Sequence, residues 1–166
     1  SIRMEPVFMI LGESAATATT AISLTGNEIA QTVRGNAGSN VLNGRGGNDT
    51  LTGGLGNDFF VFNTALNATK NRDAITDFNV ANDTIRLENT GAGLFNTLAV
   101  GTLNAAFFKA NATGTATDAN DRIIYETDTG KLFYDSNGSA AGGSILFATL
   151  SNAVKPVLTN FDFFVI

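Results

Sequence analysis

The sequence predicts an all-β protein: a right-handed parallel β-roll that is capped by an antiparallel β region at its C-terminal side. Three observations lead to this fold class: a nine-residue repeat that begins with Gly, an apolar column in phase with it, and the composition. Gly (18) and Phe (13) are plentiful, Pro is limited to two residues and Trp is absent. Together with many Asn, Thr and Asp residues, and no long helix-forming stretch, this profile favours strands joined by many turns.

Composition also excludes several classes of protein. The 166 residues are 43% hydrophobic, which suffices for one domain or for two small units sharing a core. The net charge is −5 and the ten Lys and Arg are scattered, so we expect no nucleic-acid partner. The chain has no apolar run long enough for a transmembrane segment, and its start lacks signal-peptide features. Without Cys or His, disulfides, thiolate sites and His-based catalysis are excluded.

The repeat occupies residues 26–61 as four consecutive nonads, GNEIAQTVR, GNAGSNVLN, GRGGNDTLT and GGLGNDFFV. They begin at Gly26, Gly35, Gly44 and Gly53. Their eighth positions are apolar: Val33, Leu42, Leu51 and Phe60. Their sixth positions are Gln31, Asn40, Asp49 and Asp58. Each nonad therefore splits into a Gly-rich turn and an extended half with one inward side chain, so two nonads form one coil of about 18 residues.

The loops of this predicted roll suit calcium. Four apolar side chains are a thin core, so the loops need another source of stability. Loops two nonads apart lie on the same edge, where sixth-position side chains and carbonyls freed by tight Gly turns come together. Such an all-oxygen cage favours Ca²⁺ over zinc or copper, and Mg²⁺ resists losing its waters.

GRGGND, followed by GGLGND and Phe59–Phe62, resembles the GGxGxDxUx nonapeptide of RTX (hemolysin-type) proteins. The resemblance implies a set of calcium ligands. On one edge, carbonyls of the second nonad and the side chain of its sixth residue would meet carbonyls and the carboxylate of the fourth. This set is Asn36, Gly38, Asn40, Gly53, Leu55 and Asp58. About two to four ions are expected, held weakly at the first coil.

On the other edge, the resemblance implies that Gly44, Gly46 and Asp49 face the first nonad, where Gln31 replaces Asp. We therefore expect only weak binding between those two nonads. Two further sets remain open, each completed by a carboxylate that follows the roll, with Asp73 and Asp77 as the candidates. These sets are Arg45, Gly47 and Asp49, or Gly54, Gly56 and Asp58.

The remaining segments flank the roll. We expect residues 1–25 to be a leader strand or a remnant of an upstream region, with a strand over 20–25 that places Leu24 on the apolar column. Residues 62–166 form the predicted capping β region. DAITDFNVANDTIRL in this region resembles the segment that closes the roll in serralysin-type proteases. Four apolar residues of this segment should pack on the roll's open end: Ile75, Phe78, Ile85 and Leu87.

Further along, residues 94–108 predict a short helix or turn. Strands over 123–127 and 131–135, joined at a turn over 128–130, and a third strand over 144–150 predict an antiparallel meander. The loop at 135–138 has some likeness to a calcium loop but reads as a plain turn. Residues 160–166 resemble the uncleaved signal of type I secretion substrates, so we expect a secretion signal near 150–166 that also becomes a final core strand.

The resemblance implies a calcium-dependent folding and type I secretion module at the C-terminus of a secreted bacterial protein, extracellular or at the cell surface. Its partners would be calcium, the secretion machinery and an upstream domain that carries any catalytic activity. The alternative is a calcium-stabilised adhesion or polysaccharide-binding module of a surface-layer protein or extracellular enzyme. A row of exposed Tyr and Arg would favour that alternative, but Tyr125 and Tyr134 fall in predicted core strands. Glu126 and Asp128, the nearest carboxylate pair, fit an ordinary hairpin.

Overall fold

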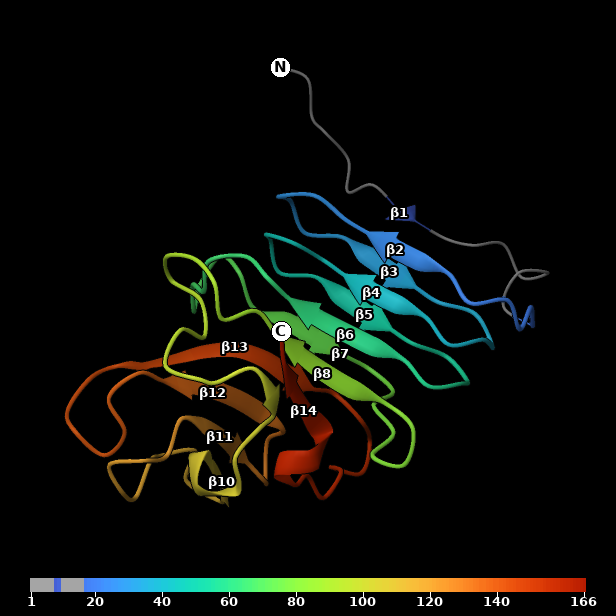
Figure 1. Ribbon diagram of the computed structural model, residues 1–166. Coiled ribbons are helices and arrows are strands. Elements are labelled where there is room, and N and C mark those ends of the chain that lie inside the picture. Colours follow the sequence, from blue (N-terminus) through green and yellow to red (C-terminus); the bar gives the residue numbers. More distant parts are fainter. Residues whose placement is uncertain (1–7, 10–16) are drawn as a thin grey trace.

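The computed structural model describes residues 8–9 and 17–166, and in them the chain forms short strands and two turns of 3-10 helix (Figure 1). The strands are β1 Phe8–Met9, β2 Ser23–Thr25, β3 Thr32–Arg34, β4 Val41–Asn43, β5 Thr50–Thr52, β6 Phe59–Phe62, β7 Asp73–Ile75, β8 Thr84–Leu87, β9 Gly101–Thr102, β10 Phe108–Asn111, β11 Ile123–Glu126, β12 Lys131–Asp135, β13 Ser144–Leu150 and β14 Phe163–Val165. The 3-10 turns are η1 Ala105–Phe107 and η2 Asn160–Asp162. None of the described helices is long and apolar enough to cross a membrane.

Within the described residues the strands form two sheets. The first has the order β1-β3-β5-β7-β13-β12-β11-β10 and the second β2-β4-β6-β8-β14-β9. Consecutive strands of the roll alternate between the sheets, and each pairs in parallel with the strand two places along the chain. This is the coil that the nonads predict, so the all-β fold with a parallel roll is confirmed.

Two stacks of apolar side chains fill the space between the sheets. In the second sheet the stack is Leu24, Leu42, Phe60, Ile85 and Phe163. In the first sheet it includes Val33, Leu51, Ile75 and Leu150. All of these except Leu24 are fully buried, which confirms the apolar column of the nonads. The in-phase repeat produces the stacks because residues 18 apart occupy equivalent positions in strands that pair in register.

The coil continues past the nonads instead of ending at residue 61. Ile75 and Ile85 are buried as expected, but they extend the two stacks as a further coil, β7 and β8. The side chains that follow them in the stacks come from far along the chain, Leu150 of β13 and Phe163 of β14. The predicted DAITDFNVANDTIRL cap is thus part of the roll, and β13 and β14 cover its end (Figure 1).

The C-terminal part contains the predicted meander, because β11, β12 and β13 pair in antiparallel order. Parallel pairing of β13 with β7 fuses this meander to the roll. Tyr125 and Tyr134 are buried, as predicted. Edge-to-face contacts link Phe95 to Tyr134 and Phe147, with ring centroids 5.1 Å apart in both pairs. The turn expected within 94–108 is present as η1.

The final residues join the second sheet next to its edge strand β9. Strand β14 pairs with β8 on one side and with β9 on the other. Asp162 closes a capping box on η2, since its carboxylate accepts the Thr159 backbone N–H at 2.6 Å and the Thr159 side chain bonds back to the helix. The final core strand predicted for residues 160–166 is therefore confirmed.

Candidate metal centre

The sixth-position side chains form a ladder along each edge of the roll. Each carboxylate accepts the backbone N–H of the sixth residue one coil earlier. Asp49 Oδ1 accepts from Gln31 N at 2.7 Å, and Asp58 Oδ1 accepts from Asn40 N at 2.8 Å. These bonds fix one carboxylate oxygen of each Asp and leave the other to face its own Gly turn.

Both ladders extend beyond the nonads. Asp73 Oδ1 accepts from Asp49 N at 2.9 Å on one edge, and Asp83 Oδ1 accepts from Asp58 N at 3.0 Å on the other. Asp73 was among the predicted residues, whereas sequence reasoning missed Asp83. The pattern that could have revealed it is Asp-x-apolar: Asp83 stands two residues before Ile85, as Asp49 stands two before Leu51.

The free oxygens of the two nonad aspartates are the most informative atoms of the site. Asp49 Oδ2 and Asp58 Oδ2 are buried and have no hydrogen-bond partner. The residues themselves are 2% and 0% exposed. A buried, unpartnered carboxylate oxygen costs on the order of several kcal/mol unless a cation or donor meets it. These atoms fit a hard cation, because they are carboxylate oxygens, each lies against the Gly turn of its own nonad, and the chain has no Cys or His.

The buried aspartates of the two ladders have raised pKa values. The pKa of Asp49 is raised to about 6, mainly by burial and to a smaller extent by the nearby Glu28 carboxylate. Burial raises the pKa of Asp73 to about 7 and that of Asp83 to about 6, each with a further contribution from a neighbouring aspartate. The pKa of Asp58 is raised by burial and, less strongly, by Asp77. A divalent cation would relieve this accumulation of charge.

The Gly turns leave backbone carbonyls between successive coils. A Cβ on Gly54 would lie 2.3 Å from Asn36 O, and one on Gly56 would lie 2.6 Å from Gly38 O. Both glycines have positive φ, 101° and 103°, which lets the turns stack this closely. A Cβ on Gly35 would lie 2.3 Å from Gly53 O. Carbonyls of the second and fourth nonads therefore lie between the turns that the predicted site joins.

The remaining predicted residues occupy distinct positions. Leu55 has a side chain that is 73% exposed, so only its backbone can face the site. The Asn40 side-chain amide donates to Gly38 O and to Asn36 Oδ1, so these hydrogen bonds lie within the second turn. Asp77 accepts the N–H groups of Gly53 and Gly54 at 2.9 and 2.8 Å.

On the other edge, a Cβ on Gly26 would lie 2.6 Å from Gly44 O, and one on Gly47 would meet the backbone of Ile29. Arg45 adopts a left-handed conformation (φ 67°), and its carbonyl accepts the Thr64 hydroxyl. Gly46 lies against Glu28. Among the described residues, no three carboxylates gather closely enough to hold an ion by themselves, so any cation needs the backbone carbonyls as well.

Two other acidic features have ordinary local roles. Glu126 pairs with Lys131 at 3.5 Å and accepts the Thr129 hydroxyl, and Asp128 accepts the Thr127 hydroxyl at 3.1 Å. In the 135–138 loop, Asp135 Oδ1 accepts the Asn137 N–H at 3.1 Å. That bond makes a side-chain turn of the kind expected from the sequence.

Comparison with known proteins identifies the repeat. Residues 25–60 match the family described as RTX calcium-binding nonapeptide repeat, in four copies. No curated protein matches the chain. Among solved structures, the chain is similar to the solution structure of the AlgE6R3 subunit from the Azotobacter vinelandii mannuronan C5-epimerase, with 19% sequence identity and a TM-score of 0.42, over 96% of this chain and 85% of that one. The predicted RTX repeats are confirmed by the family match.

Proposed function

From the RTX calcium-binding repeats that the chain carries, we propose that it is a calcium-dependent folding module of a secreted bacterial protein. The observation that supports this most directly is the pair of buried, unpartnered oxygens, Asp49 Oδ2 and Asp58 Oδ2. Without a cation, the ladders bury carboxylates that repel one another and oppose folding. A site filled at a hundredfold excess over its Kd adds about 2.7 kcal/mol to stability.

The proposed ligands follow the two ladders. On one edge, carbonyls of Asn36, Gly38, Gly53 and Leu55 act with Asn40 and Asp58, and Asp77 and Asp83 complete the end of the roll. On the other edge, the turn residues Gly44 to Gly47 act with Asp49 and Asp73. About two to four calcium ions fit this arrangement, each with carbonyl and carboxylate oxygens.

Export by a type I system fits this chemistry. In a compartment with little calcium the roll does not fold, so the chain stays competent for passage through a channel. The proposed signal near 150–166 includes β14, which the folded protein holds between β8 and β9. Such a signal is accessible only before folding. Calcium outside the cell then drives folding of the nonads at 26–61, together with the further coil and the C-terminal cap formed by 62–166, and supports an upstream domain.

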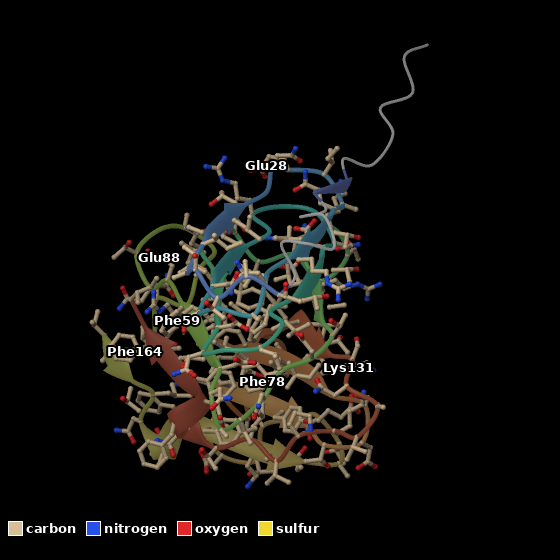
Figure 2. All side chains as sticks on the ribbon, turned by 90° about the vertical axis from the view of Figure 1, so that its right-hand side faces the viewer. Glu28, Phe59, Phe78, Glu88, Lys131 and Phe164 are labelled. Carbon is tan, nitrogen blue, oxygen red and sulfur yellow. The ribbon has the colours of Figure 1, made fainter. Side chains whose placement is uncertain are left out.

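One observation favours the second candidate, binding of an acidic polysaccharide. On the outer face of the second sheet, the Arg86 guanidinium lies 3.5 Å from the centre of the Phe59 ring. Phe164, which is 41% exposed, pairs with Arg86 in the neighbouring strand. Figure 2 shows Phe59 and Phe164 on the same side of the molecule. If this candidate is right, Arg86→Ala abolishes retention on an acidic-polysaccharide column in calcium, whereas Arg122→Ala does not.

The main proposal is tested by circular dichroism and calorimetry during calcium titration, with magnesium and chelator controls. We expect a calcium-specific gain of β signal that is weakened in Asp58→Ala. Asp128→Ala, an exposed change in the β11–β12 turn, is the matched control. An identical spectrum with calcium and with chelator would refute the proposal.

A further inference from the structure

The first coil departs from the repeat in one informative way. Its sixth residue is Gln31, so the edge that the first and third nonads share lacks one of the two carboxylates. The Gln31 side chain is engaged in its own turn, since its Oε1 accepts the Asn27 N–H at 2.9 Å, and its backbone N–H donates to Asp49 Oδ1. On this edge Asp49 Oδ2 is nevertheless buried and without a partner.

A carboxylate from a different position of the nonad reaches this edge. Glu28, the third residue of the first nonad, lies over Gly46, the third residue of the third nonad. A Cβ on Gly46 would lie 2.3 Å from Glu28 Oε2. Because Gly46 has no side chain, the Glu28 carboxylate can lie against its backbone. Among the described residues the Glu28 side chain has no hydrogen bond or ion pair. Figure 2 shows it at the end of the roll that is remote from Lys131 and Phe164.

The other edge has no such arrangement. The third residues of the second and fourth nonads are Ala37 and Leu55, and Leu55 is 73% exposed. There the additional carboxylate comes from Asp77, after the roll, which binds the turn at Gly53 and Gly54. Each edge thus has one nonad aspartate with a buried free oxygen and one carboxylate supplied from outside the sixth position.

We propose that Glu28 is the second carboxylate ligand of a calcium site between the first and third nonads, replacing the aspartate that Gln31 displaces. The inference rests on the proposed calcium-dependent function. Glu28 and Asp49 together carry the two negative charges that neutralise Ca²⁺, and the turn carbonyls supply neutral ligands. The first coil therefore binds calcium despite its degenerate sixth position.

The test is calorimetric titration of the intact chain with calcium alone, with Glu28→Gln compared to Glu126→Gln, a matched change in the hairpin. We expect Glu28→Gln to lose one ion, or to weaken one site at least about tenfold, because carboxylate count sets calcium affinity. Glu126→Gln should match the wild type. Gly46→Ala keeps Glu28 but displaces its carboxylate, so the same site should weaken.

A further variant separates ligation from folding. Gln31→Asp restores a sixth-position carboxylate, and in that background Glu28→Gln should have a much smaller effect on affinity. Unchanged stoichiometry and affinities in Glu28→Gln and Gly46→Ala would overturn the role of Glu28 while leaving calcium binding at Asp58 intact. A wild-type chain that binds no calcium would instead refute the proposed function itself.

Discussion

The substitution Asp49→Asn should change the stability of the protein in opposite directions with and without calcium. Asp49 is 2% exposed, its Oδ2 has no partner, and burial raises its pKa from 3.8 to about 6. At about pH 7.5 the folded, calcium-free protein therefore holds a carboxylate that is charged against its environment. The rise in pKa corresponds to about 3 kcal/mol of lost stability above the folded pKa. Asp49→Asn removes the charge and keeps an oxygen for the Gln31 N–H.

We expect Asp49→Asn to stabilise the calcium-free protein by about 2 to 3 kcal/mol and to destabilise the calcium-bound protein. The assay is denaturant unfolding followed by circular dichroism, in chelator and in millimolar calcium. If the wild type is unfolded in chelator, the gain appears as a larger β signal of the variant. Asp128→Asn should change neither state. Destabilisation of the same size with and without calcium would show that Asp49 has only a structural role.

Three further predictions concern other parts of the roll. Burial raises the pKa of Asp49, Asp73 and Asp83 from 3.8 to about 6 or 7, so these groups should stabilise the calcium-free protein most at about pH 4 and lose that contribution by about pH 7. Calcium affinity should rise over the same range, and flat denaturation midpoints across it would contradict this. Asp83→Asn should weaken calcium binding although it lies outside the nonads, and calorimetry that matches the wild type would exclude it from the site. Leu51→Ala should cost about 2 to 5 kcal/mol in saturating calcium, measured by denaturation, and a loss below about 1 kcal/mol would mean that the stack is loosely packed.

The sequence allowed prediction of the roll because the nonads are in phase. Each Gly-headed nonad gives one strand, and the eighth positions of alternate nonads fall into one stack. After residue 61 the phase is lost: the interval between stacked residues grows from 18 to 24 between Leu51 and Ile75, and to 25 between Phe60 and Ile85. The longer loops place Asp83 out of phase with the nine-residue repeat, so the repeat did not predict its role. Its Asp-x-apolar spacing is unchanged.

Pairing between distant segments was beyond the sequence pattern. Nothing local to Leu150 or Phe163 indicates that β13 and β14 join the roll's two sheets in parallel, since that pairing depends on which sheet edges are left uncovered. The role proposed for Glu28 was equally hidden. It depends on Gly46 lying beside Glu28 one coil away, a contact that only the stacked register creates.

That register also explains why the core and the calcium sites are one structural feature. The sixth and eighth residues of a nonad are two apart along an extended backbone, so they point to the same side of the sheet. When Leu51 and Phe60 enter the core, Asp49 and Asp58 are turned inward at its edge and lose their water. A one-residue slip would expose the apolar stack and the carboxylates together. The apolar contacts therefore cannot form without burying the charge, so a roll with this register needs a cation to reach its full stability.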